Sequence, residues 1–238
     1  MQIRNSNPAA QAEMQTLLGK VATIRSNVAS IERDYSDGYW DLNDTQSNFR
    51  DMSWPLRNAQ SDTDKKDVSS DGWRLDSLIG TAERNLRDFD REMGQADQAS
   101  RTVNQTLPQA GQSAQALRAL LADRPELQAE LDRATATLTT AGNDHQSADS
   151  DAARADREAA DAERELGWTD TYVWRIRSDR PGLNVSSDAR FLGSKLDRSE
   201  WDVRDSSSSL GFARNRESRA AQGFQSAEQA LKALQGKL

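Results

Sequence analysis

The sequence predicts an all-α protein in which four long antiparallel helices form an elongated, coiled-coil-like bundle with up-down-up-down connectivity. Apolar residues recur at alternating steps of three and four through most of the 238 residues, as along the seam of a coiled coil. Only 35% of the residues are hydrophobic and 29% are charged, and the mean hydropathy is -0.87. Because a seam between helices needs fewer apolar residues than a globular core, low hydrophobicity with strong periodicity favours long helices.

The first helix is expected to have Pro8 in its first turn, a position that suits proline. Its apolar seam begins at Met14 and ends at Met52. We expect this helix to end at Trp54, because a following proline disfavours the helical conformation. Residues 55–67 are strongly polar and are predicted to form a loop.

The second helix is expected to begin at Ser69, a favourable N-cap residue, with Asp71 in the first turn where it complements the helix dipole. Its seam continues to Leu107. Pro108 is predicted either to stop the helix or to open the next element. A short connecting helix is then expected over about residues 112–122.

The third helix is expected to open with Pro125 and to continue to about Ile176. The seam keeps its phase across Gly142, which predicts an unbroken helix there. Its alanine-rich stretch, residues 141–162, would allow a neighbouring helix to approach closely. A fourth helix is predicted to begin near Ser186 and to extend to the end of the chain.

An internal repeat is indicated by the segment Val-Ser-Ser-Asp, which occurs at Val68 and at Val185. The seams that follow the two segments share the same phase. We therefore divide the chain into one hairpin with a short connecting helix, residues 1–124, and a second hairpin, residues 125–238. These hairpins could pack side by side in one bundle domain, lie end to end, or pair with a second copy of the chain in a homo-oligomer.

The acidic composition argues against a nucleic-acid partner. The net charge is -7, with 31 basic and 38 acidic residues interspersed rather than separated into a basic face. No stretch reaches the roughly 18 apolar residues of a membrane span. Residues 1–8 lack the apolar core of a signal peptide, so the compartment is open: cytoplasmic by default, periplasmic if a leader had been removed. The preference for Asp over Glu and Arg over Lys is compatible with a bacterial source.

No residue pattern indicates catalysis, a cofactor or a metal, and the chain is expected not to be an enzyme. It has no cysteine, and its one histidine, His145, falls on the seam and is predicted to be a buried, satisfied side chain. Acid pairs such as Asp41 with Asp44 and Asp62 with Asp64 are predicted to be solvated. The Glu-x-x-His and His-Glu-x-x-His metal motifs are absent from the sequence.

The six tryptophans and three tyrosines cluster toward one end of the predicted bundle. They could fill a wider core there, or form a recognition tip, because Trp, Tyr and Arg are the usual anchors of protein interfaces. The candidate partner-binding residues at this tip are Trp54, Arg57, Trp73, Trp174, Arg175, Arg177 and Arg180.

The sequence therefore predicts a non-enzymatic structural or interaction protein, a scaffold-like bundle that binds a protein partner through its aromatic and arginine-containing tip or an exposed helix face. One alternative is a sensory or small-ligand-binding bundle with a ligand among the aromatic rings. A second alternative is a helical protein that binds the membrane surface.

Overall fold

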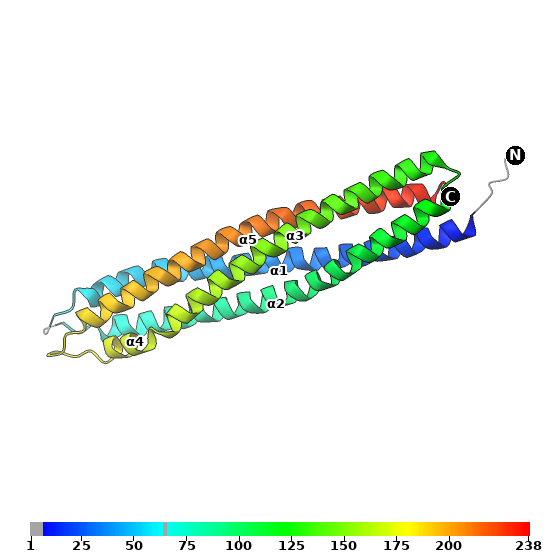
Figure 1. Cartoon of the computed structure of the whole chain (residues 1–238). Helices are drawn as coiled ribbons and strands as arrows, with labels where there is room; N and C mark the ends of the chain where they lie inside the picture. The colour runs from blue at the N-terminus through cyan, green and yellow to red at the C-terminus, as the bar shows by residue number, and fades with distance from the viewer. Residues whose placement is uncertain (1–6, 64–65) are drawn as a thin grey trace. The chain divides into compact units, whose positions relative to one another are not determined.

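The computed structural model describes residues 7–63 and 66–238, and within them every regular element is a helix (Figure 1). The elements are α1 (Pro8–Gln60), α2 (Ser69–Leu120), α3 (Pro125–Gly167), α4 (Asp170–Arg177) and α5 (Ser186–Gln235). The all-α prediction is confirmed, and the helix–helix contacts fit an up-down bundle. The antiparallel direction and coiled-coil packing stay predictions, and residues 1–6 and Asp64 lie outside the described residues.

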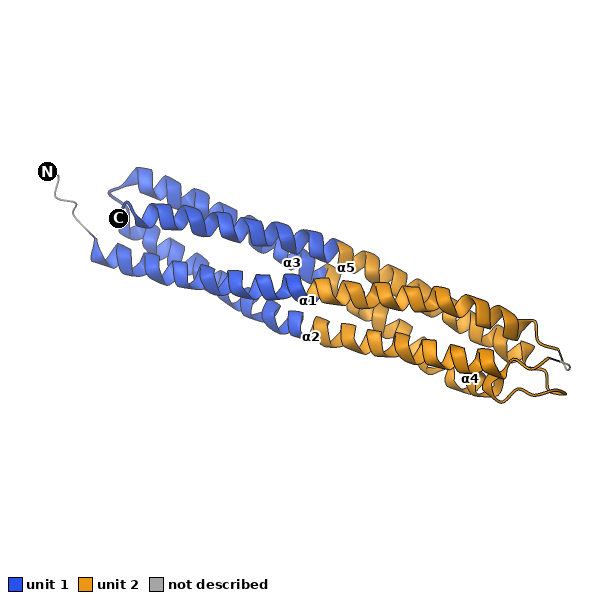
Figure 2. Cartoon of the chain, turned by 180° about the vertical axis from the view of Figure 1, so that it is seen from behind, with its two compact units in different colours: residues 1–34, 95–150, 212–238 blue, residues 35–94, 151–211 orange. Residues whose placement is uncertain are grey.

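The chain forms two compact units, each built from segments of four long helices (Figure 2). Unit 1 comprises Met1–Asp34, Gln95–Ser150 and Phe212–Leu238, and unit 2 comprises Tyr35–Gly94 and Asp151–Gly211. Each unit contains parts of both predicted hairpins, so the hairpin division at residue 124 stays a prediction.

The predicted seams supply the cores of both units. Seam residues at no more than 1% exposure include Leu17, Val103, Leu131 and Phe224 in unit 1, and Leu42, Leu75, Ala162 and Val203 in unit 2. Burial of a Leu, Val or Phe side chain stabilises a fold by roughly 1.5–3 kcal/mol. Repeated along every helix, this burial holds each unit together.

Two helix ends differ from the prediction, because α1 passes through Pro55 to Gln60 and α2 passes through Pro108 to Leu120. Proline inside a helix removes one hydrogen bond and costs about 3 kcal/mol. Beyond each proline the seam continues to bury apolar side chains, since Ala59 and Leu117 are both at 0% exposure. That burial offsets the cost, and the predicted separate helix at 112–122 is part of α2.

The third predicted helix is unbroken at Gly142, as expected, but it ends at Gly167 instead of near Ile176. The hydroxyl of buried Thr169 donates to the carbonyl oxygen of Leu166 at 2.7 Å, and α4 begins one residue later. A side chain that binds the nearby backbone competes with the helical hydrogen-bond pattern. The short helix α4 thereby becomes a separate element of unit 2.

Candidate functional site

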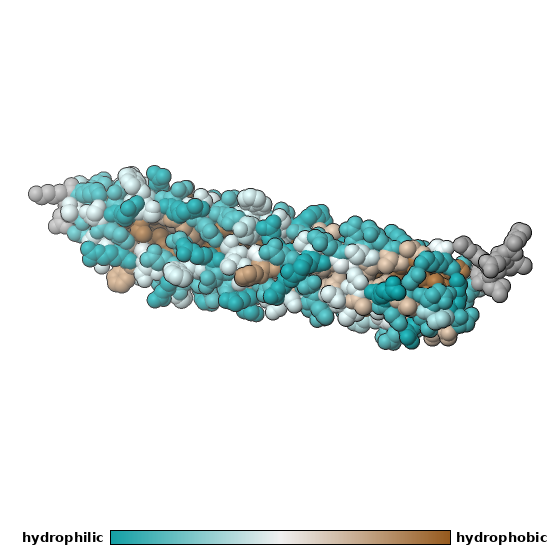
Figure 3. All heavy atoms as spheres, turned by 90° about the horizontal axis from the view of Figure 1, so that it is seen from above, coloured by the Kyte–Doolittle hydropathy of each residue, from teal (hydrophilic) through white to brown (hydrophobic). Residues whose placement is uncertain are grey.

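All six tryptophans belong to unit 2, and each has 53–64% of its surface exposed. They are Trp40, Trp54, Trp73, Trp168, Trp174 and Trp201. The interpretation that the aromatic rings fill a widened core is therefore wrong for the tryptophans, whereas Tyr35, at 1% exposure, does lie in the core. The surface around the exposed apolar side chains is mostly hydrophilic (Figure 3).

Four of the tryptophan rings have a basic side chain nearby, as in cation–π pairs. The shortest separation is 3.5 Å, between the Arg177 guanidinium carbon and the centre of the Trp73 ring. The three further pairs are Lys195 with Trp168 at 4.2 Å, Arg204 with Trp201 at 5.7 Å, and Arg74 with Trp54 at 5.9 Å. The exposed rings are thus interleaved with positive charge.

Arg177 and Trp73 meet because α2 begins very close to the end of α4. A Cβ atom added to Gly72 would lie 2.5 Å from the backbone nitrogen of Arg177, so only glycine allows this approach. The Arg177 guanidinium also donates to a carboxylate oxygen of Asp76 at 3.0 Å. We call the set Trp73, Asp76 and Arg177 the closed corner, since its arginine is stacked and paired.

The remaining predicted partner-binding residues lie in the same unit but are not all free. Arg175 donates to the Asp188 carboxylate at 2.7 Å, which neutralises it within the chain. Arg57 is exposed, and its Nε donates to the carbonyl oxygen of Ser53 at 3.2 Å. Trp174 and Arg180 are exposed.

A surface groove of about 660 Å³ lies between the end of α1 and the start of α5. Its lining comprises Ser53, Leu56, Arg57 and Gln60 from α1, and Arg190, Gly193, Ser194, Asp197, Arg198 and Trp201 from α5. Three of these side chains are arginines and one is a carboxylate. Among these residues the sequence indicated only Arg57 as a candidate partner-binding residue. Helical spacing places the lining residues of α5 on one face of that helix, but only the structure shows that this face lies beside α1.

Two buried carboxylates bind the starts of α2 and α5 in a reciprocal manner. Asp62, after α1, accepts the backbone N–H of Val185 at 2.9 Å, and Asp179, after α4, accepts the backbone N–H of Val68 at 2.8 Å. Each aspartate has 5% of its surface exposed. The prediction that Asp62 is solvated is therefore wrong, because a loop carboxylate gains a buried backbone donor here.

A polar group next to each helix start adds a second cap. The Asp67 carboxylate accepts the N–H of Ser69 at 2.9 Å, and the Asn184 side chain accepts the N–H of Ser186 at 3.0 Å. Ser69 was predicted as the N-cap, but it already lies in α2 and Asp67 caps it instead. This hydrogen bond lowers the pKa of the Asp67 carboxyl.

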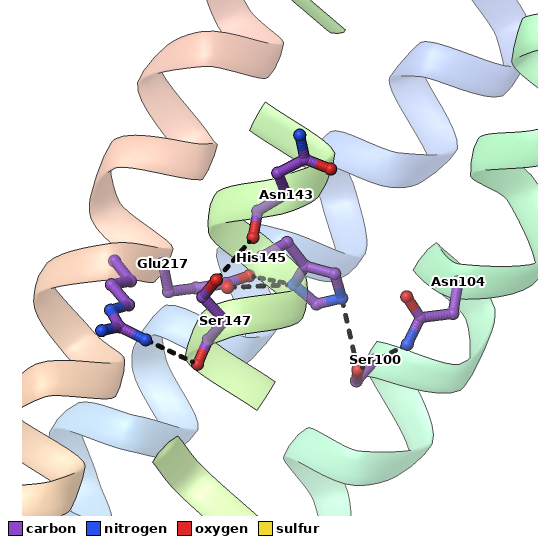
Figure 4. Close-up of polar contacts among 7 residues, drawn as sticks. Ser100, Asn104, Asn143, His145, Ser147 and Glu217 are labelled. Atoms are coloured by element: carbon purple, nitrogen blue, oxygen red, sulfur yellow. Dashed lines mark hydrogen bonds and ion pairs between the residues drawn. The ribbon is translucent and has the colours of Figure 1, made fainter. Parts of the chain in front are cut away.

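Unit 1 contains a polar cluster in its core, formed by three seam residues on three helices (Figure 4). The His145 ring lies between Glu217, whose carboxylate is 2.9 Å from Nδ1, and Ser100, whose hydroxyl is 3.2 Å from Nε2. Burial raises the pKa of Glu217, while the hydrogen bond from His145 acts in the opposite direction. His145 is buried and hydrogen-bonded, as predicted.

The order of serine, histidine and carboxylate in this cluster is that of a hydrolase triad. Catalysis would require a substrate to reach the serine oxygen, however, and Ser100, His145 and Glu217 have at most 1% of their surface exposed. The arrangement can satisfy buried polar groups and fix how the helices pair, which is the better attested use of polar residues in a helical core.

Within residues 7–63 and 66–238, acidic and histidine side chains do not gather in threes that could hold a metal ion. None of the helices described there has an apolar stretch long enough to cross a membrane. Comparisons with protein-family models, with curated proteins and with solved structures gave no match to this chain.

Proposed function

We propose that this chain is a non-enzymatic interaction protein that binds a protein partner through the exposed tryptophans and arginines of unit 2. The observation that supports this most directly is the exposure of all six tryptophans, 53–64% each, within one of the two units. Aromatic side chains next to arginines are the residues most often found as energetic anchors of protein interfaces.

The distribution argues for a surface role because these rings contribute little to the core. An exposed large apolar side chain loses the free energy that burial would provide, about 25 cal/mol per Å² of apolar surface. A single exposed ring is ordinary, but the concentration of all six exposed tryptophans in one of the two units supports an interaction role for unit 2. Docking of a partner would bury these rings.

The small-ligand alternative receives less support, since each of the six tryptophans is more than half exposed at the surface of unit 2. The membrane alternative remains a competitor, because Trp and Arg also suit lipid headgroups. Sedimentation with vesicles containing anionic lipid distinguishes binding of a protein partner from binding of a membrane surface. The membrane alternative is favoured if the native chain pellets with the vesicles and variants with substituted tryptophans do not.

The test compares partner capture by the native chain and by the variants Trp54→Ala and Trp174→Ala. Native folding of each variant is first checked by circular dichroism and thermal melting. Removal of an interface anchor costs about 2 kcal/mol or more, so we expect capture to fall by roughly thirtyfold. The matched control is Phe212→Ala, an aromatic that is 60% exposed but belongs to unit 1; equal capture by all four proteins would reject the proposal.

A further inference from the structure

We propose that the groove between α1 and α5 binds an acidic segment of a protein partner, whose carboxylates pair with Arg57, Arg190 and Arg198. An apolar side chain of the same segment would pack on Trp201. This inference rests on the proposed function and specifies the chemistry of the partner.

The first argument is a comparison with the closed corner, which occupies the equivalent place on the repeated segment. Val185 follows Val68 by 117 residues. The same spacing relates Gln60 to Arg177, Trp73 to Arg190, and Asp76 to Gly193. At the closed corner, arginine, tryptophan and aspartate satisfy one another.

In the groove, the equivalent residues leave the surface open. Gly193 offers no carboxylate, and a Cβ added there would lie 2.8 Å from the amide nitrogen of Gln60. Arg190 stands where the closed corner has its tryptophan. All three members of the closed corner are thus replaced in the groove, by Gln60, Arg190 and Gly193. The stack and ion pair of the closed corner have no equivalent there, which leaves a place for groups from another molecule.

The second argument is charge. The side chains of Arg57, Arg190 and Arg198 are exposed, and among the described residues none of them forms an ion pair. Asp197 is the sole acidic side chain of the described lining. A local excess of positive charge on a chain of net charge -7 favours an acidic partner. The planar guanidinium matches a carboxylate in a two-point contact.

The third argument is the spacing of the groups along α5. Arg190 and Arg198 are eight residues apart, or about 12 Å along a helix. An extended peptide covers that distance in about four residues, so carboxylates at positions i and i+4 can reach both arginines. Trp201 lies three residues beyond Arg198 and is 64% exposed. Cations spread over this length, with an aromatic ring at one end, fit a peptide segment better than a compact anion.

The test uses a fluorescein-labelled nine-residue peptide with Glu at its second and sixth positions and Leu at its eighth, so that all three side chains lie on one face of the extended peptide. The control peptide replaces both Glu residues by Gln. Fluorescence anisotropy should show that the Glu peptide binds at least about tenfold more tightly, since hydrogen bonds to charged groups contribute about that factor each. The difference should shrink as salt is raised, because exposed charges are screened.

Variants locate the binding site. We expect Arg190→Gln and Arg198→Gln each to weaken binding about tenfold. Gly193→Asp should abolish it by placing a carboxylate in the groove, three residues from Arg190 along α5. Arg84→Gln is the matched control. Arg84 lies beside the closed corner, 117 residues before Trp201, and the Glu peptide should bind this variant as tightly as the native chain.

Several outcomes would overturn the inference. These are equal binding of the two peptides, equal effects of Arg84→Gln and Arg190→Gln, or binding of inorganic pyrophosphate in place of the Glu peptide, which would indicate a small-anion site. These outcomes are distinguishable from failure of the proposed function. If the Glu peptide did not bind in the groove but partner capture still depended on Trp54 and Trp174, the chain would remain an interaction protein and only the groove would be rejected as its binding site.

Discussion

The two units differ in which side chains they bury. Unit 1 has ionisable side chains in its core, whereas unit 2 has large aromatic side chains on its surface. Unit 1 buries ionisable His145 and Glu217 at 0% exposure, whereas unit 2 leaves Trp40 and Trp201 more than 60% exposed. His145 and Glu217 fall on the apolar seams, and the tryptophans fall beside them. Position along the helical repeat therefore decides burial in this protein more strongly than the polarity of the side chain does.

The largest effect is expected from breaking the buried pair of unit 1. His145→Leu leaves the Glu217 carboxylate without its partner, and removal of one member of a buried pair costs about 3–5 kcal/mol. The double variant with Glu217→Leu should be clearly more stable than this single variant, because it has no unpaired charge. Urea unfolding followed by circular dichroism measures both.

Tryptophan fluorescence reports on unit 2 alone, since all six tryptophans lie there. The emission of folded His145→Leu should therefore match that of the native chain. If the free energy of unfolding of His145→Leu fell by less than about 1 kcal/mol, the buried pair would contribute little to the stability of unit 1.

An intermediate effect is expected from Gly72→Ala in unit 2. The new Cβ would meet the backbone of Ile176 and Arg177 at 2.7 and 2.5 Å, and backbone atoms cannot move aside as a flexible side chain can. Overpacking of this kind costs about 1–3 kcal/mol, and the tryptophan emission of the chain should change as Arg177 moves away from Trp73.

Gly80→Ala is the matched control for this substitution. It lies in the same helix, and a Cβ added there meets nothing within 4 Å. It should stabilise the chain by about 0.5–1 kcal/mol, the usual gain of alanine over glycine in a helix. If Gly72→Ala stabilised the chain equally, the close approach of α2 to α4 would be rejected.

The smallest effect is expected at Asp41, a half-buried acid of unit 2. Burial, followed by the nearby carboxylates of Asp88 and Glu92, raises its pKa from 3.8 to about 6. The folded state thus holds this proton more tightly than the unfolded chain, so stability is lost as pH rises from about 4 to 6.

Asp41→Asn should remove this pH-dependent loss. After allowance for solvent screening, we expect the variant to be up to about 1 kcal/mol more stable above pH 6 and similar to the native chain at pH 3. Asp51→Asn, on the exposed face of the same helix, removes the same charge and should not reproduce the gain. Thermal melts at the two pH values decide between these outcomes.

Much of the fold could be predicted because a 3.6-residue repeat is a local signal. The seams, the start of α5 and the unbroken passage at Gly142 were all readable from it. The ends at Pro55 and Pro108 were not, since tertiary burial of later seam residues outweighed the cost of each proline. The break after Gly167 was also missed, because a single threonine hydroxyl competes for a backbone carbonyl.

The candidate site could be predicted less well, because it depends on which helix faces meet. The sequence grouped the tryptophans with Arg175 and Arg177, but it gave no sign that Asp188 and Asp76 already pair with these arginines. The spacing of Arg190 and Arg198 was visible, but their position beside Arg57 was not. Pairing between helices distant in sequence is information that no single helix carries.

The exchange between Asp62 and Val185 and between Asp179 and Val68 has the form of an isologous contact, in which each half gives what it receives. Residues 125–238 contain both an acceptor, Asp179, and a donor, Val185. In two separate copies of this half, Asp179 of each copy could accept the Val185 N–H of the other. In one copy alone, that N–H would lack this carboxylate partner. In the intact chain, the connection between the halves acts as a covalent tether, which raises the effective concentration of each for the other.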